Sequence, residues 1–279
     1  MRILYVSQLF PPEMGALPAR VSELARSWAS AGHDVTVLTG FPNHPTGKIH
    51  DAYRSQFWRG TIREKQEGFE IVRTWVYPSP NRHTLERTIN YVSFFVSASL
   101  RGIWLKRPDV VIGTSPQLLT GLAGWLLASC FRSRFVLEVR DLWPESLFAS
   151  EVTESNSLLY RVLKKLVAFL YEHADLIVPV TKPIEAVISS LFPKTKTVVI
   201  ENGVDPNYFK PIEDVEKIRK KLGLKTSWIV SYIGTIGSAH HLETLLQTAQ
   251  QLKDRLPNTL FLLIGEGAKK SQLEKRAQK

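Results

Sequence analysis

Two residues of opposite charge, Arg140 and Asp141, directly follow a short apolar stretch in the sequence RFVLEVRDLWPES. Residues 135–139 are apolar apart from one Glu, as expected of a strand buried on both faces of a parallel sheet. In such sheets, ligands bind beyond the carboxyl ends of the strands. We therefore interpret the pair as functional. The alternative is an ion pair that only closes a loop, with Trp143 packed over it.

Segments typical of strands and of helices alternate along the chain. Apolar runs typical of buried strands occupy residues 2–10, 34–41, 69–79, 108–116, 133–141, 175–181 and 197–204. Helical periodicity predicts helices at 19–33, 85–106, 118–131, 156–174 and 182–191. This alternation predicts an α/β fold in which helices cover both faces of a parallel sheet. The same order restarts near Pro206, so we expect two domains, 1–205 and 206–279.

The composition excludes several classes of protein. The chain has 279 residues, of which 44% are hydrophobic and 22% charged, as in ordinary globular domains. A single cysteine, Cys130, excludes a disulfide framework, and no Cys/His cluster has zinc-site spacing. The N-terminal apolar run is too short for a signal peptide, and no apolar stretch reaches the roughly 20 residues of a membrane span. We therefore expect a cytoplasmic protein.

Part of the net charge of +10 is concentrated between residues 54 and 107, where ten Lys and Arg stand against four Glu. Aromatic residues, among them Trp58, Trp75 and Trp104, are interspersed with these charges. Three interpretations compete: a solvated surface, contact with an anionic inner-membrane surface, or nucleic-acid binding. Nucleic acid is the least favoured, because no recognition motif accompanies the charge.

The order of several motifs resembles a known enzyme family. The motifs are PPEMGALPAR, GFPNHPTGK, PDVVIGTSP, VRDLWPES, ADLIVPVT, VVIENGVDPNYFKP, SYIGTIGSAHHLETLL and LFLLIGEG. Together they resemble the retaining glycosyltransferases of family 4, and most of all the WbuB-like branch of surface-polysaccharide enzymes. The resemblance implies a GT-B fold with two Rossmann-like parallel-sheet domains, the second incomplete here. It also implies that the first domain binds the acceptor and the second binds the nucleotide sugar.

In the first domain, the resemblance assigns the donor phosphates to the loop before the first helix. Gly15 matches the first glycine of this loop, and the helix predicted from about Ala19 directs its positive end at it. The alternative for Gly15 is a simple strand-to-helix turn. The family often has a second glycine and a histidine here, where this chain has Ala16 and Arg20. We therefore expect Arg20 to act as a phosphate cation.

Four further residues are expected around the acceptor side of the cleft. Arg140 stands where many relatives carry a sugar-binding His, so we expect it to orient Asp141 or to bind an anionic group. Asp141 is expected to bind a sugar hydroxyl or the acceptor, and these two are the candidate catalytic residues. Asn43 of GFPNHPTGK and Asn202 of ENGVD are expected in the cleft, with a simple turn as the alternative for Asn202.

In the second domain, the resemblance places three residues near the nucleotide. Gly234 matches the glycine that ends the first strand, beneath the diphosphate. Relatives commonly follow it with an Arg and a Lys, where this chain has Thr235 and His240. His240 is therefore expected to donate to the phosphate, with a solvated histidine as the alternative. Gly265 is expected to line the nucleotide.

A pair of glutamates that is diagnostic of the family has no counterpart before the chain ends at Lys279. The second domain shows two clear strands, so residues 228–236 are expected to lack neighbours and to expose apolar surface. We therefore expect a truncated product of such an enzyme.

The expected function is transfer of a sugar, with retention, from a nucleotide-diphosphate donor (a UDP-sugar) to a lipid-linked glycan in O-antigen or capsule synthesis. No cofactor or metal is expected, because no DxD motif is present. The alternative from another class is a non-catalytic acceptor-binding or membrane-associated remnant. A dinucleotide-dependent enzyme is set aside, because the first strand leads into PPEMGALPAR and not into G-x-G-x-x-G.

Overall fold

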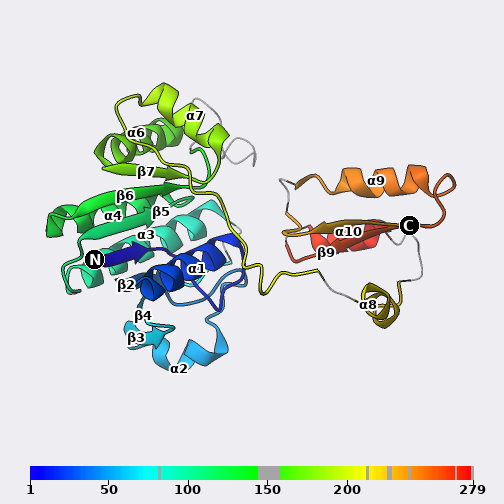
Figure 1. Cartoon of the computed structure of the whole chain (residues 1–279), viewed down its shortest axis with the longest axis horizontal. Coiled ribbons are helices and arrows are strands. Elements are labelled where there is room, and N and C mark those ends of the chain that lie inside the picture. Colours follow the sequence, from blue (N-terminus) through cyan, green and yellow to red (C-terminus); the bar gives the residue numbers. More distant parts are fainter. Residues whose placement is uncertain are drawn as a thin grey trace. The chain divides into compact units, whose positions relative to one another are not determined.

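The structure is a computed structural model, and it describes residues 1–80, 83–143, 158–211, 214–224, 228–237, 240–267 and 269–277. The described residues form two units: unit 1 extends to Gly203 and unit 2 starts at Val204 (Figure 1). The part of the motif VRDLWPES from residue 144 onward lies outside the described residues. So does Arg82, one of the basic residues between 54 and 107.

Unit 1 is built on a sheet whose order is β3-β4-β2-β1-β5-β6-β7. Its strands are β1 (Arg2–Val6), β2 (Asp34–Gly40), β3 (Thr61–Gln66), β4 (Phe69–Thr74), β5 (Val110–Thr114), β6 (Arg134–Val139) and β7 (Leu176–Pro179). All neighbouring pairs are parallel except β3 with β4, which are antiparallel. The carboxyl ends of the six parallel strands therefore meet at one edge of the sheet, where ligands are expected.

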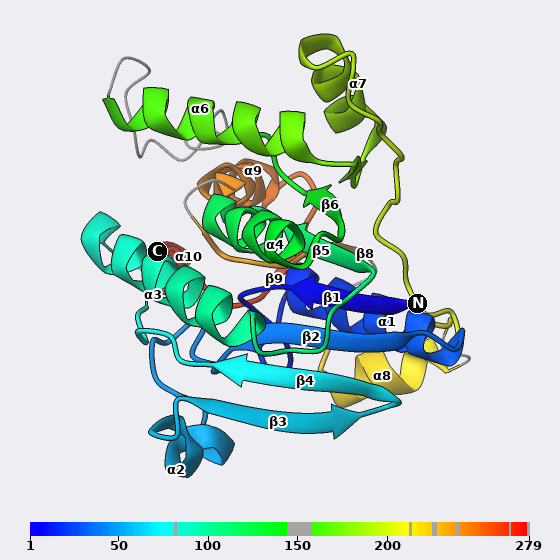
Figure 2. The ribbon, with the colours of Figure 1, turned by 90° about the vertical axis from the view of Figure 1, so that its left-hand side faces the viewer.

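Helices cover both faces of this sheet (Figure 2). They are α1 (Ala16–Ser30), α3 (Thr84–Gly102), α4 (Leu118–Phe131), α6 (Leu158–His173) and α7 (Lys182–Leu191), with a short η1 (Asp51–Tyr53) and α2 (Arg54–Phe57) before β3. Because strand side chains alternate, Ile3 and Tyr5 of β1 pack on the α1 side, whereas Leu4 and Val6 pack with α3, α4 and α6. β1 is thus buried on both faces, as its apolar sequence predicts.

Unit 2 is smaller and less buried. It contains α8 (Val215–Lys221), β8 (Trp228–Ile233), α9 (Glu243–Leu252), β9 (Thr259–Ile264) and α10 (Lys270–Ala277). Its described core is a small cluster around Ile236, Leu242 and Leu273. Parallel β8 and β9 form a two-stranded sheet, and Trp228 and Ile233 of β8 are 73% and 74% exposed. Apolar surface was expected to be exposed in residues 228–236, and β8 exposes it; however, β8 has a neighbour in β9, and Ile236 is buried.

The α/β class predicted from the sequence is confirmed, but several elements differ. The first helix begins at Ala16, three residues earlier than the predicted Ala19. Residues 197–204 were predicted as a strand, and this is wrong: the segment forms only one isolated bridge, Ile177 with Thr197. Strand β3 and helix α8 were not predicted.

Candidate active site

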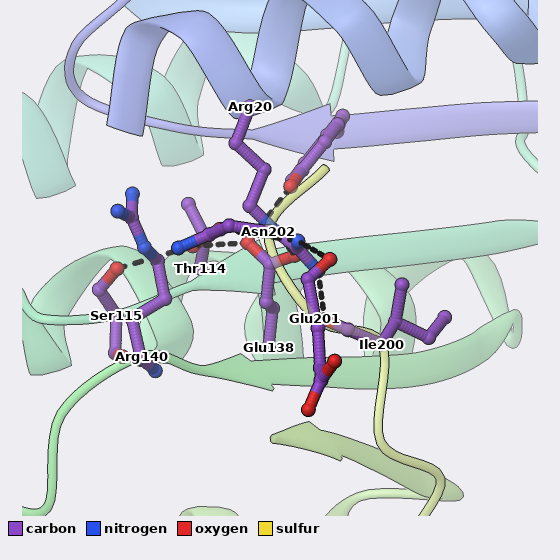
Figure 3. Close-up of polar contacts among 9 residues, drawn as sticks. Arg20, Thr114, Ser115, Glu138, Arg140, Ile200, Glu201 and Asn202 are labelled. Carbon is purple, nitrogen blue, oxygen red and sulfur yellow. Dashed lines mark hydrogen bonds and ion pairs between the residues drawn. The ribbon is translucent and has the colours of Figure 1, made fainter. Parts of the chain in front are cut away.

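The carboxylate of Glu138 organises the carboxyl edge of the unit 1 sheet (Figure 3). One of its oxygens accepts from Arg20 Nε at 2.8 Å, and the other accepts from the hydroxyls of Tyr5 at 2.9 Å and Thr114 at 2.7 Å. The side chains of Arg20 and Glu138 are 6% and 3% exposed. A carboxylate buried to this degree is stable when it is paired and hydrogen-bonded, as it is here.

Arg20 uses the rest of its guanidinium to hold residues 200–202, in the segment that follows α7. Its Nη2 donates to the Ile200 carbonyl at 2.8 Å, and its Nη1 donates to the Glu201 carbonyl at 2.8 Å and to Asn202 Oδ1 at 3.2 Å (Figure 3). The side chain expected to serve as a phosphate cation is thus committed to protein groups. This arrangement makes Arg20 a positioning residue that ties α1, β6 and residues 200–202 together.

Arg140 and Asp141 follow β6 at this same edge, and no ion pair joins the two. The Arg140 backbone N–H donates to Ser115 Oγ at 2.7 Å. In the described part of the chain, the buried Nε and Nη1 of Arg140 have no hydrogen-bond partner. Asp141 is exposed, and the half-buried Trp143 packs against the core. The alternative of an ion pair that closes the loop is therefore not what the structure contains.

Burial sets the electrostatics of this cluster. It lowers the pKa of the Arg140 guanidinium, and the nearby charge of Glu138 opposes the shift. It also raises the pKa of the Tyr5 hydroxyl well above its usual value, with the Glu138 charge acting in the same direction. Tyr5 therefore stays protonated as a donor to Glu138. Two cations lie near the buried anion of Glu138: the buried Arg20, which is ion-paired with it, and the half-buried Arg140, which feels its charge.

A second polar cluster joins the loops after β1 and β2. The buried carboxylate of Glu13 accepts backbone N–H bonds from Phe10 at 3.2 Å, Asn43 at 3.0 Å and His44 at 2.9 Å. The Asn43 side chain donates to the Phe41 carbonyl at 3.0 Å. Burial raises the pKa of Glu13, and the three N–H donors oppose this. Asn43 is thereby fixed on the wall of a cleft at the sheet edge.

Gly15 is the N-cap of α1, with a φ of 137° that favours glycine. No side chain of the described residues caps the helix, and its first turn carries no acidic residue. The free N–H groups of this turn therefore offer an anion a favourable position.

In unit 2, two glycine loops pack backbone against backbone beyond the ends of β8 and β9. Gly234 has a φ of 159° and donates its N–H to the Ile264 carbonyl at 3.0 Å. A Cβ at Gly265 would collide with the Gly234 carbonyl oxygen, and one at Gly267 with that of Ile236. Both glycines are thus required by the close approach of the two loops. His240 is exposed and lies edge-on to Tyr232, with ring centroids 6.1 Å apart.

The sequence predicted that Arg140 and Asp141 belong to the site, but it did not identify Glu138, whose charge lies near both Arg140 and Arg20. Glu138 was visible only as a lone acid in an apolar strand, and its partner lies 118 positions away along the chain. A buried acid needs partners, so the signal was present. The described residues contain no cluster of His, Cys, Asp and Glu able to hold a metal ion.

The two units match glycosyltransferase families one after the other along the chain. Residues 15–203 match the family described as a glycosyl transferase 4-like domain, and residues 214–279 match glycosyl transferases group 1. The chain therefore belongs to the family 4 glycosyltransferases.

Two curated relatives are glycosyltransferases by name. The chain is 28% identical to the colanic acid biosynthesis glycosyl transferase WcaI of Escherichia coli strain K12, over 100% of the chain and 69% of WcaI. It is 30% identical to WbjE of Pseudomonas aeruginosa over 62% of the chain and 43% of WbjE. The chain thus spans at most about two thirds of these relatives.

Solved structures share the fold. Sucrose-phosphate synthase from Thermosynechococcus elongatus superimposes with a TM-score of 0.71 at 19% identity, over 99% of the chain and 67% of that structure. Anabaena HepE, in complex with UDP and glucose, gives a TM-score of 0.63 at 16% identity, over 100% of the chain and 65% of HepE.

Proposed function

We propose that the chain transfers a sugar, with retention of anomeric configuration, from a UDP-sugar to a lipid-linked glycan during surface-polysaccharide synthesis. The observation that carries the proposal is the Arg140 guanidinium at the carboxyl edge of the sheet, a half-buried cation of which two nitrogens have no partner among the described residues. A cation with unused N–H donors is suited to the negative charge of a departing diphosphate or of a phosphorylated acceptor.

The donor class is supported by similarity and by the glycine loops. HepE, which shares the fold, was crystallised with UDP and glucose. Gly234 and Gly265 let the two loops approach closely at the carboxyl ends of β8 and β9, where such folds bind nucleotides. The uncapped first turn of α1, next to Gly15, favours a phosphate for the same electrostatic reason.

Retention is proposed from the resemblance to the retaining glycosyltransferases of family 4, and the state of Glu138 bears on the route by which it could occur. Three donors engage its carboxylate, so it is not free to attack the anomeric carbon. The transition state must then be stabilised by cations and backbone dipoles.

The test is a transfer assay with UDP-sugars and vesicles that carry lipid-linked glycans, with the product's anomeric proton observed by NMR. We expect a product of retained configuration, and Arg140→Gln should lower kcat/KM about 100-fold or more. Arg161→Gln, at an exposed position of α6, is the matched control. An inverted product, or full activity of Arg140→Gln, would contradict the proposal. Acceptor binding without turnover would instead support a non-catalytic remnant.

We further propose that unit 1 contacts an anionic membrane through α3. The exposed face of α3 and the turn after it is apolar, and it comprises Leu85, Ile89, Val92, Val96, Leu100, Ile103 and Trp104. Its members recur at helical spacing, which is typical of a helix that lies in a membrane interface. None of the helices in the described ranges is long and apolar enough to span a bilayer.

The structure changes which residues of 54–107 are candidates for this contact. Phe57 and Phe94 are core residues, and Arg73 is buried against Glu64, so these take no part in a surface patch. Exposed apolar side chains of α3 replace them, and the basic residues of α3 itself are the partly exposed Arg87 and Arg101.

Vesicle flotation with phosphatidylglycerol tests the contact. Val92→Glu with Val96→Glu should abolish flotation, because two charges would enter the interface. Val162→Glu, at a 53% exposed position on α6, is the matched control. Unchanged flotation of the α3 variant would rule out this face.

A further inference from the structure

A cleft of about 110 Å³ opens at the carboxyl edge of the unit 1 sheet, where it borders the Glu138 cluster: Thr114 lines the cleft, whereas Arg20 and Glu138 do not. It lies where β1 and β5 end and where α3 and α4 begin. One water molecule needs roughly 10–15 Å³ of such space. The cleft therefore has room for a group of several non-hydrogen atoms.

Gln8 lines this cleft with an acceptor that has no donor. In the described residues its Oε1 has no hydrogen-bond partner and under 1 Å² of exposed surface, and the whole residue is 5% exposed. A buried unsatisfied acceptor costs about 1–3 kcal/mol. Such a group calls for a donor that comes from the cleft.

The orientation of the Gln8 amide follows from a chain of bonds that ends at a backbone carbonyl. Asn90 Nδ2 donates to the Tyr77 carbonyl at 2.6 Å, so Asn90 Oδ1 must face Gln8. Gln8 Nε2 then donates to that oxygen at 2.6 Å, and Oε1 is left over. A carbonyl can only accept, so flipping either amide would put two donors or two acceptors together. The free atom is thus an acceptor.

The lining of the cleft carries no full charge. No Lys, Arg, Asp or Glu is among its lining residues, although the chain has a net charge of +10. Partial burial lowers the pKa of His44, which favours its neutral form. Tyr91 supplies a ring, Leu9 and Pro116 supply apolar surface, and Thr120 supplies a hydroxyl. A neutral wall of amides, hydroxyls and one ring suits a hydroxyl-rich, uncharged ligand.

We propose that this cleft binds a neutral sugar ring and that Gln8 Oε1 accepts a hydrogen bond from one of its hydroxyls. The inference rests on the proposed function in one respect, because the ring would be that of the acceptor glycan. It adds the chemical class: an uncharged sugar, and neither a uronic acid nor a phosphate, occupies this part of the acceptor. The cleft should select sugars that carry this hydroxyl, because a sugar that lacks it would leave Gln8 Oε1 unpaired.

The experiment measures direct binding of simple sugars to the whole chain by saturation-transfer NMR. The probes are the methyl glycosides of glucose, galactose and N-acetylglucosamine, with glucuronate and glucose 6-phosphate as charged counterparts. We expect at least one neutral glycoside to bind and the charged probes to bind more weakly. Gln8→Met should weaken neutral-sugar binding at least tenfold.

Two further variants make the result decisive. Gln66→Met changes the same residue type at an exposed position of β3 and should bind sugars as the unaltered chain does. Gln117→Trp fills the cleft from its rim without touching the Gln8–Asn90 pair, so it tests the site even if Gln8→Met does not fold. Binding that neither Gln8→Met nor Gln117→Trp weakens, preferential binding of a charged probe, or no binding at all would overturn the proposal. Because no donor is present, the result is independent of transferase activity.

Discussion

At the scale of single residues, Glu138 holds the site together. It receives a cation and two hydroxyls, which come from α1, β1 and β5. Removing the charge of one member of a buried pair leaves the other uncompensated, and this commonly costs about 3–5 kcal/mol. The geometry of residues 200–202 depends on the same pair, because Arg20 also binds their carbonyls.

Glu138→Gln should therefore lower the free energy of unfolding by about 3–5 kcal/mol. Urea denaturation followed by circular dichroism measures this. Glu172→Gln makes the same change at an exposed position of α6 and should stay within about 0.5 kcal/mol. A loss of under about 1 kcal/mol for Glu138→Gln would mean that the pair adds little to stability.

Glu13 gives the fold a pH dependence of defined sign. Burial raises its folded pKa above the unfolded value of about 4.3. The folded chain then holds the Glu13 proton more tightly than the unfolded chain does. The contribution of this proton to the free energy of unfolding is therefore fully present below the unfolded pKa. It is lost as the pH rises through the folded pKa.

The difference in unfolding free energy between the unaltered chain and Glu13→Gln should therefore shift in favour of the unaltered chain as the pH falls from about 7 to 4.5. Denaturant titrations at both pH values measure it, with Glu172→Gln as the baseline. A constant difference, or one of opposite slope, would contradict the assignment.

At the scale of elements, most of unit 1 could be predicted because its strands are apolar and its helices periodic. Strand β3 was missed because TIREKQ is polar, as befits an edge strand that pairs on one side only. Residues 197–204 misled because TVVI is a run of β-branched residues, which are typical of strands, yet the segment forms only one bridge to β7. The contact of Arg20 with Glu138 could not be predicted, because no local pattern connects residues so far apart.

The contact between β5 and α4 depends on glycines that face each other. A Cβ added at Gly124 would lie 3.0 Å from Gly113 Cα and 3.1 Å from Phe135 Cε2. Gly124→Ala should therefore destabilise unit 1 by about 1–3 kcal/mol through overpacking. Thermal denaturation measures it, with Gly203→Ala as control, because a Cβ there meets no atom within 4 Å. Equal melting temperatures for the two variants would show that α4 can shift freely.

At the scale of the whole molecule, the two units differ in how well their sheets are buried. In unit 1, strands such as β1 and β5 are covered on both faces. In unit 2, β8 has one neighbour among the described strands and exposes Trp228, Val230 and Ile233. Two-stranded sheets with little cover are marginally stable.

Hydrogen exchange followed by mass spectrometry should therefore show faster exchange in peptides that cover β8 than in those that cover β1 or β5. The strands of unit 1 serve as the internal standard in the same sample. Equal protection of β8 and β1 would show that unit 2 is as stable as unit 1.

The central claim is that this chain acts on a nucleotide sugar, and calorimetric titration with UDP and UDP-N-acetylglucosamine tests it most directly. A melting curve of the same sample establishes that the protein is folded. We expect saturable binding that Gly265→Ala abolishes, because its Cβ would displace the loop at Gly234. A cooperatively melting chain that binds neither compound would contradict the account.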